Sequence, residues 1–204
     1  MAKKSASLSD RLRALVERLD AGDALPRGVE RDLVATLDLW ESEPHGKRAA
    51  KPAPTPVSGT GPIEIWSDGS CSPNPGPGGW GAIIEADGQR RELSGAKSGS
   101  TNNVMEMMAA IEALRCTPEG AHVRVTTDSE YLKNGITQWI RAWKRNGWKT
   151  AAKTPVKNQE VWQALDELVS KRSVTWHWVA GHSGHPENER CDELANEARR
   201  SLRD

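Results

Sequence analysis

Five stretches in the last two thirds of the chain alternate apolar and polar side chains with the two-residue period of a β-strand. The first, IEIWSD, stops at an Asp-Gly pair, which predicts that this strand ends in a turn. The second and third flank another Asp-Gly pair and predict a hairpin. The predicted strands are residues 63–67, the hairpin halves GWGAIIEADG and QRRELSGAK, residues 122–127 and residues 173–179.

Between these strands, apolar residues recur every three to four positions, which predicts helices. One follows the capping residues Thr101-Asn102-Asn103, and the last begins near Pro186, a residue suited to the first helical turn. Two more cover roughly residues 129–146 and 158–171. Strands that alternate with helices predict an α/β fold with helices on the faces of a sheet.

The first 61 residues differ from the rest. Residues 1–44 carry two apolar stripes at helical spacing and predict a small helical hairpin, whereas residues 45–61 are rich in Pro, Ala, Gly and Ser and predict a linker. Residues 62–204 are then the main domain. A hairpin of this size has little core of its own, so we hypothesise that it mediates self-association or tethers a substrate. Light scattering and substrate affinity of a chain lacking residues 1–48 would test both ideas.

Composition excludes several classes of protein. The chain is 36% hydrophobic and 27% charged, as in folded globular proteins, and has no apolar run long enough to cross a membrane. Its N-terminus lacks the apolar core of a secretory signal. The three cysteines are far apart and form no CxxC pair, which predicts free thiols and a cytoplasmic location.

Carboxylates occupy suggestive places in this pattern. Asp68 and Asp128 each follow a predicted strand, so they share an edge of the sheet if these strands are parallel neighbours. Glu106 has alanines three, four and seven positions later, which predicts that it faces the sheet. Asp192 borders the apolar stripe of the last helix. The alternative is that Asp68 only begins a turn and that Glu106 and Asp192 are ordinary surface acids.

Four acids brought together repel one another, and this repulsion raises some of their pKa values. Divalent cations relieve it, and Mg²⁺ prefers carboxylate oxygens. Two such ions about 3.5–4 Å apart can hold the attacking and leaving oxygens of a phosphodiester. The pattern therefore predicts a candidate two-metal site for phosphodiester hydrolysis.

The segment from residue 131 to 159 contains no acid, and tryptophans interleave with its bases in ITQWIRAWKRNGWK. Such a patch suits contacts with phosphates, sugars and bases of a nucleic acid. The alternative is that Trp139 and Trp143, four residues apart, anchor a helix in the core while the bases cover its outer face.

His182 lies in the glycine-flanked loop AGHSGH, ahead of Asp192. A histidine there can move protons near neutral pH. The alternative is an incidental loop residue.

Four stretches in this order resemble bacterial ribonuclease H of type 1: DGSCSPNPGPGGWGA, TNNVMEMMAAIEAL, TDSEYLKNGITQWIRAWKRNGWKT and VAGHSGHPENERCDELA. The resemblance covers roughly residues 62–200. It implies a five-stranded mixed sheet flanked by helices, and an expected monomeric catalytic domain. It also implies an endonuclease that uses two Mg²⁺ ions, with Mn²⁺ as a substitute, to hydrolyse the RNA strand of RNA–DNA hybrids to 5′-phosphate and 3′-hydroxyl ends.

The resemblance implies roles for individual residues. Asp68, Glu106, Asp128 and Asp192 match the metal-binding catalytic acids, and His182 matches a loop histidine that assists proton transfer or product release. The implied substrate contacts are Cys71, Asn74, Asn102 and Asn103 in the minor groove, Thr101 and Asn158 at a DNA phosphate, and Trp139, Trp143, Lys144, Arg145, Trp148 and Lys149 in a basic handle, residues 139–149.

The chain departs from the family pattern at two positions: Glu130 stands where Gln is common, and Gly99 where some members have a phosphate-binding Arg.

Two alternative functions compete with a ribonuclease H. One is a relative that binds hybrids without cutting them, and the other is a DNA nuclease or integrase of the same fold. The four acids argue against the first rival, and the handle with Asn102 and Asn103 argues against the second.

Overall fold

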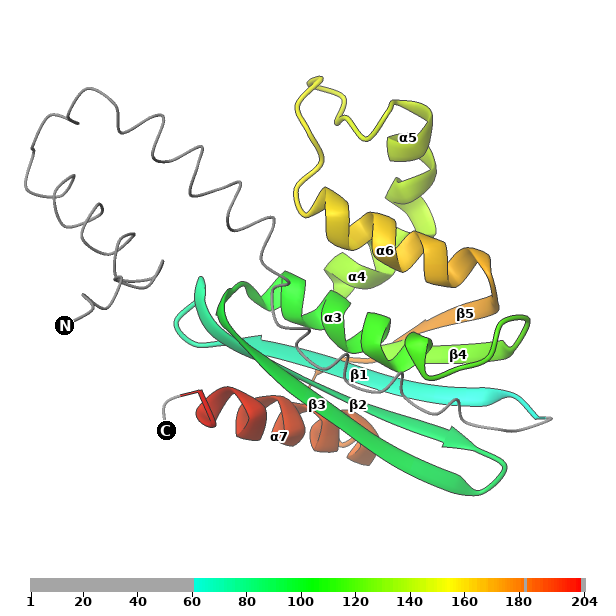
Figure 1. The fold of residues 1–204 in the computed structure, drawn as a ribbon, viewed down its shortest axis with the longest axis vertical. Coiled ribbons are helices and arrows are strands. Elements are labelled where there is room, and N and C mark those ends of the chain that lie inside the picture. The colour runs from blue at the N-terminus through cyan, green and yellow to red at the C-terminus, as the bar shows by residue number, and fades with distance from the viewer. Residues whose placement is uncertain (1–60, 182, 203–204) are drawn as a thin grey trace, which may run out of the picture. The chain divides into compact units, whose positions relative to one another are not determined.

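The computed structural model describes residues 61–181 and 183–202, and within them five strands form one mixed sheet (Figure 1). The strand order is β3-β2-β1-β4-β5, with β1 antiparallel to β2 and parallel to β4. This confirms the predicted α/β sheet. The strands are β1 (Ile63–Cys71), β2 (Gly76–Ala86), β3 (Gln89–Ser100), β4 (His122–Thr127) and β5 (Ser173–Trp178).

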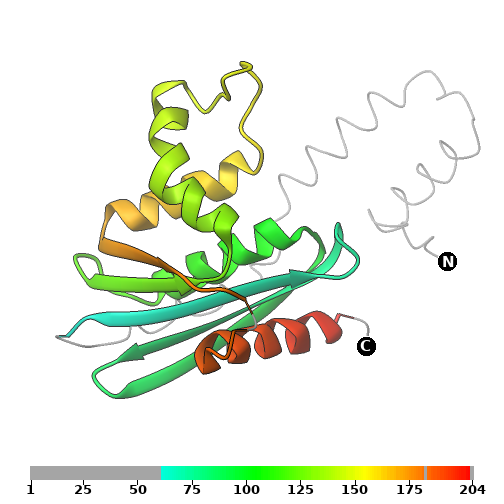
Figure 2. The same cartoon turned by 180° about the vertical axis from the view of Figure 1, so that it is seen from behind.

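Helices cover both faces of the sheet. Two of them, α3 and α6, lie on one face, and α7 lies on the other (Figures 1 and 2). None of the helices in the described ranges has the length and apolar character needed to span a lipid bilayer. The helices are α3 (Asn102–Arg115), α4 (Glu130–Asn134), the π-helix η1 (Gly135–Trp139), α5 (Ile140–Arg145), α6 (Gln159–Ser170) and α7 (Pro186–Arg200).

The helix predicted over residues 129–146 is divided into α4, η1 and α5. The π-helix begins at Gly135, against which the Trp162 ring packs so closely that a Cβ would overlap it. The absence of a side chain at Gly135 therefore leaves room for a large, fully buried ring. The helical hairpin and linker predicted for residues 1–44 and 45–61 lie outside the described residues, except for the last linker residue.

The hydrophobic core lies mainly between the sheet and the helices α3 and α6. Ile63 and Ile65 of β1 are fully buried, in keeping with the alternation that predicted the strand. The hairpin between β2 and β3 turns at Asp87-Gly88, where both residues have positive φ, as a tight two-residue turn requires. A smaller cluster that includes Ile83 lies beneath α7.

The first strand is longer than predicted. The sequence places its end at the Asp68-Gly69 pair, and that prediction is wrong. Pairing with β4 stops at Ser67, but pairing with β2 continues to Cys71 opposite Gly78. The antiparallel partner on one side sustains the strand after the parallel partner has ended, so Asp68 sits inside the strand.

Candidate active site

Three carboxylates meet at the end of β4. Asp68 comes from β1, Glu106 from α3 and Asp128 from the residue after β4, and their nearest oxygens all lie within 4.8 Å of one another. The three acids are 38 and 22 residues apart along the chain. The structure therefore brings together three of the four acids that the sequence singled out, in a geometry that can share a cation.

Strand register and close packing create this meeting point. Ser67 pairs with Thr127 in parallel, so the residues that follow them, Asp68 and Asp128, are neighbours. A Cβ on Gly69 would overlap the backbone of α3 at Glu106. Because Gly69 has no side chain, α3 can lie directly on β1, and this places Glu106 beside Asp68.

The cluster is electrostatically strained without a cation. Burial, with added repulsion from Asp128, raises the pKa of Asp68 to about 7. Burial and the carboxylates of Asp68 and Asp128 raise the pKa of Glu106 well above its usual value. Oε2 of Glu106 and Oδ1 of Asp128 are buried and have no hydrogen-bond partner among the described residues. Buried acceptors without donors are costly, and oxygen-binding cations such as Mg²⁺ fit this donor set.

Asp192 lies at the edge of this cluster. It repels Asp68 and so helps to raise the pKa of Asp68, but it is not one of the three acids whose oxygens converge. It is half-buried on α7, and its Oδ1 accepts a hydrogen bond from Nδ2 of Asn196 at 2.8 Å.

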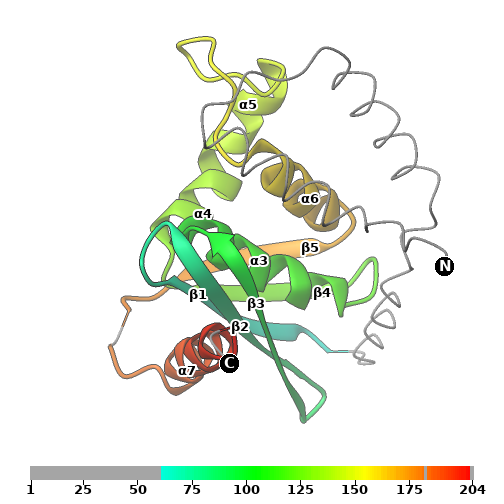
Figure 3. The ribbon, with the colours of Figure 1, turned by 60° about the vertical axis from the view of Figure 1, so that its left-hand side comes forward.

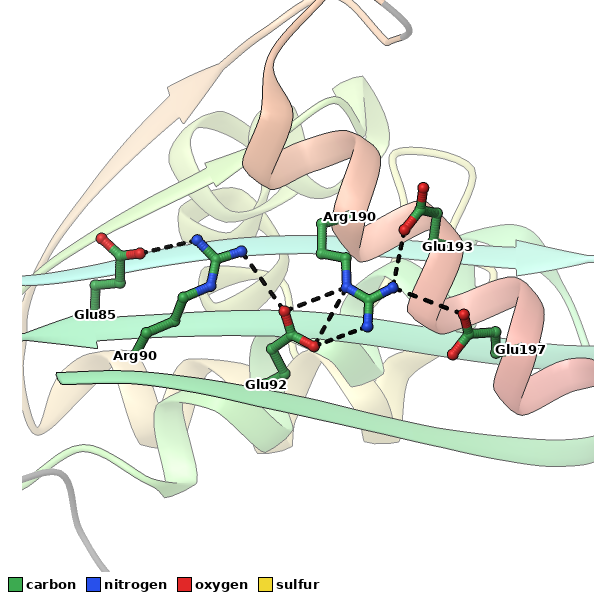
Figure 4. Close-up of polar contacts among 6 residues, drawn as sticks. All are labelled: Glu85, Arg90, Glu92, Arg190, Glu193 and Glu197. Carbon is green, nitrogen blue, oxygen red and sulfur yellow. Dashed lines mark hydrogen bonds and ion pairs between the residues drawn. The ribbon is translucent and has the colours of Figure 1, made fainter.

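The packing of α7 on the sheet determines where Asp192 lies. Gly79 and Gly81 of β2 leave room for the α7 backbone at Ala195 and Cys191. An ion-pair network also joins the helix to β3 (Figure 4). Arg190 contacts Glu92 of β3 at 3.0 Å and two glutamates of its own helix at 2.9 and 3.7 Å. The network consists of Glu85, Arg90, Glu92, Arg190, Glu193 and Glu197.

Asn188 is a site residue that the sequence reasoning missed. It is 3% exposed, and its Nδ2 donates a hydrogen bond to Oδ2 of Asp128 at 3.3 Å. The signal lay in its spacing, since Asn188 precedes Cys191 by three residues and shares its buried face of α7. A polar residue on an otherwise apolar helix face requires a partner, and here that partner is a site carboxylate.

His182 lies outside the described residues. The residue before it, Gly181, lies so close to Asp128 that a Cβ there would be 2.7 Å from Oδ2. The loop that leads to His182 therefore starts beside the acid cluster.

Several predicted substrate residues also come together near the acids. The backbone N–H of Cys71 donates to Oδ1 of Asn102 at 2.6 Å, and the N–H of Asn102 donates to Oδ1 of Asn74 at 3.3 Å. The Thr101 side chain caps α3, where Asn103 is half-buried in the first turn. The first turn of α3 thus gathers these side chains at the end of β1.

The handle combines packing with exposed charge. The centroid of the Trp143 ring lies 5.4 Å from that of the Trp162 ring and 5.8 Å from that of the Trp139 ring. Both Trp143 and Trp148 pack against the core. Trp139 is 38% exposed. The helix-anchor interpretation therefore holds for Trp143, while Trp139 remains accessible.

The handle's cations are less uniform than the sequence suggests. Lys144 forms an ion pair with Asp166 of α6 at 2.7 Å, whereas Arg145 and Lys149 are exposed. Asn158 precedes α6 in a left-handed conformation, and its Nδ2 donates to the Tyr131 hydroxyl at 3.3 Å. Figure 3 shows α5 at the top of the view, projecting away from the sheet, with α6 below it and to the right.

The fold and the acid cluster define a ribonuclease H-like enzyme. The sequence model of the family described as RNase H matches residues 61–200. The chain is 59% identical over 136 residues to the ribonuclease H of Hydrogenovibrio crunogenus, covering 67% of this chain and 94% of that one. It is 60% identical over 133 residues to the ribonuclease HI of Brucella melitensis biotype 1, covering 65% and 86%. The chain belongs to the ribonuclease H family, in its bacterial type 1 branch.

Solved structures agree with this assignment. LC9-RNase H1, described as a type 1 RNase H with the type 2 active-site motif, superposes with a TM-score of 0.63 at 32% identity, over 72% of this chain and 74% of that one. LC11-RNase H1, solved in complex with an RNA/DNA hybrid, superposes with a TM-score of 0.52 at 25% identity, over 70% and 99%.

Proposed function

We propose that the chain is an endonuclease that hydrolyses the RNA strand of RNA–DNA hybrids, giving 5′-phosphate and 3′-hydroxyl ends, with two divalent cations. The observation that carries this proposal is the convergence of Asp68, Glu106 and Asp128. Glu106 and Asp128 each hold a buried oxygen that has no hydrogen-bond partner among the residues that the structure describes. Membership of the ribonuclease H family supports it, as does the hybrid bound to LC11-RNase H1.

The acids have a defined task in this proposal. Asp68, Glu106 and Asp128, with Asp192 from α7, would hold Mg²⁺ or Mn²⁺. When bound, such ions neutralise charge that develops on the phosphodiester and lower the pKa of a water molecule. Asn188 and the backbone around Gly69 keep the carboxylates in place, because each donates a hydrogen bond to one of them.

Other residues would select and orient the hybrid. Asn74, Asn102 and Asn103, with Cys71, lie at the end of β1, where they can contact a minor groove. Amide side chains both donate and accept hydrogen bonds, so they can distinguish a 2′-hydroxyl from deoxyribose. The exposed handle residues would contact the DNA strand, and His182 would assist proton transfer or product release.

A cleavage assay with three end-labelled duplexes tests this proposal. With Mg²⁺, we expect cleavage of the RNA strand of an RNA–DNA hybrid at a rate at least about 100-fold above that of duplex RNA or duplex DNA. The reason is that only the hybrid offers 2′-hydroxyls on one strand and deoxyribose on the other. Phosphatase sensitivity of the new 5′ ends checks the end chemistry.

The same assay separates the rivals. Cleavage of duplex DNA at a rate close to that of the hybrid would identify a DNA nuclease instead. Tight hybrid binding without any cleavage at saturating Mg²⁺ would identify a binding module. Addition of EDTA is expected to abolish cleavage, because EDTA removes the divalent cations that the acid cluster would hold.

A further inference from the structure

Asn196 links Asp192 to two hydrogen-bond donors, the Arg199 guanidinium and the Ser70 hydroxyl. Its Nδ2 donates to Oδ1 of Asp192 at 2.8 Å. Its own Oδ1 accepts from Nη2 of Arg199 at 2.9 Å and from the Ser70 hydroxyl at 3.4 Å. All four side chains are half-buried. Asp192, Asn196 and Arg199 are spaced i, i+4 and i+7, so they share one face of α7.

The chemistry of Arg199 determines how the Asn196 amide is oriented. A guanidinium only donates hydrogen bonds, so the Asn196 atom that faces it must be the carbonyl oxygen. The amide nitrogen then faces Asp192, as a carboxylate acceptor requires. The reversed amide would turn its NH2 group toward the Arg199 guanidinium, which is also a donor, and its carbonyl oxygen toward the Asp192 carboxylate, which is also an acceptor. The contact with Ser70 adds a second constraint, and it ties α7 to the strand that carries Asp68.

Asp192 is held differently from Asp68 and Asp128. Asp68 accepts from the backbone N–H of Gly69, and Asp128 accepts from the buried Asn188. Asp192 instead sits at the edge of the cluster on a separate helix. Groups behind a metal ligand orient it, and replacing them commonly weakens metal binding by about 10- to 100-fold.

We propose that Asn196 is a positioning residue for Asp192: it holds Oδ1 of Asp192 and leaves Oδ2 for a cation, while Arg199 and Ser70 hold Asn196. The inference rests on the proposed function, which assigns Asp192 to cation binding. Asn196 and Arg199 touch neither substrate nor cation in this arrangement. They act through the orientation of one carboxylate.

The test replaces Asn196 by Leu, which has a similar volume and no hydrogen-bonding groups. Mg²⁺ binding to the full-length protein is measured by calorimetry without nucleic acid, and the Mg²⁺ concentration for half-maximal hybrid cleavage is measured separately. We expect both to shift by about tenfold toward weaker binding, with KM for the hybrid unchanged within about twofold. Arg199→Met is expected to shift both in the same direction, and it serves alone if Asn196→Leu does not fold.

Matched controls separate orientation from general loosening of α7. Arg200→Met makes the same charge change as Arg199→Met at an exposed position of the same helix. Arg190→Met removes partly exposed ion pairs to β3, which contribute little beside the close packing of α7 at Gly79 and Gly81. It leaves Asn196 in contact with Asp192. Both controls are expected to bind Mg²⁺ within about twofold of wild type. Equal losses in the controls and in Asn196→Leu would overturn the proposal.

A double-variant comparison completes the test. In an Asp192→Ala background, Asn196→Leu should weaken Mg²⁺ binding no further, since the carboxylate that it positions is gone. Undiminished loss in that background, or wild-type Mg²⁺ binding by Asn196→Leu alone, would overturn the proposal. Absence of hybrid cleavage by wild type would refute the proposed function, whereas the calorimetric comparison would still decide the role of Asn196.

Discussion

Asp128→Asn is expected to lower the rate of Mg²⁺-dependent hybrid cleavage by at least about 1,000-fold. Asp128 offers the cluster a buried oxygen that has no hydrogen-bond partner within residues 61–181 and 183–202. Metal-assisted charge stabilisation of a phosphodiester transition state is worth several kcal/mol. Asparagine keeps the shape of the side chain, and its carbonyl oxygen can still accept from Asn188. The variant should therefore fold and should bind hybrid within about twofold of wild type.

Single-turnover cleavage and hybrid binding in EDTA measure the two parts of this expectation. Asp87→Asn is a matched control, because it makes the same chemical change in an exposed hairpin turn where asparagine tolerates the positive φ. It should cleave at the wild-type rate. Turnover by Asp128→Asn within tenfold of wild type would refute the assignment of Asp128 as a cation ligand.

Asp68→Asn is expected to stabilise the cation-free protein at pH 8 by as much as roughly 4 kcal/mol. The folded-state pKa of Asp68 is about 7, against an ordinary pKa of 3.8 for an aspartate side chain. Each pKa unit corresponds to about 1.4 kcal/mol, so a difference of about three units gives this upper figure. Asp68 is only 8% exposed, so solvent screens the effect little.

The sign of the pH dependence follows from proton binding. Between about pH 4 and pH 7 the folded state keeps a proton on Asp68 that the unfolded chain releases, so wild-type stability falls as pH rises through this window. Below about pH 4 both states are protonated and the shift costs nothing. The gain from Asp68→Asn should therefore be absent near pH 4 and complete above pH 7.

Urea unfolding in EDTA at pH 4.5 and at pH 8 measures this difference. Saturating Mg²⁺ at pH 8 should reduce the advantage of Asp68→Asn, because a cation stabilises only the folded state that retains the carboxylate. Asp87→Asn should show no comparable gain at either pH. An equal effect of Asp68→Asn at both pH values would contradict the electrostatic explanation and would point to packing instead.

Much of the fold follows from local patterns. The alternation around Ile63 and Ile65 and the Asp87-Gly88 turn correspond to observed elements. The error at Asp68-Gly69 has a structural cause. A pair that often begins a turn instead continues as strand here, because β2 supplies an antiparallel partner and Gly69 fits against α3.

The acids of the candidate site could be selected from sequence, but their supports could not. Asp68, Glu106 and Asp128 stood out by strand ends and helix faces, and the structure brings them together. Asn188 and Asn196 did not stand out, because amides carry no strong pattern of their own. Their importance depends on which side chain lies opposite, and that is a property of how α7 sits on the sheet.

The sequence by itself determined the order and type of most elements and the family, and it singled out four acids as candidates for the site. These features depend on short-range periodicity and on motifs, and both can be identified without knowing which residues are in contact. Only the tertiary structure decided that three acids converge while Asp192 remains at the edge, and that Lys144 is paired with Asp166. The reason is physical: convergence depends on parallel register and helix seating, which join residues far apart in the chain, and burial then sets their pKa values.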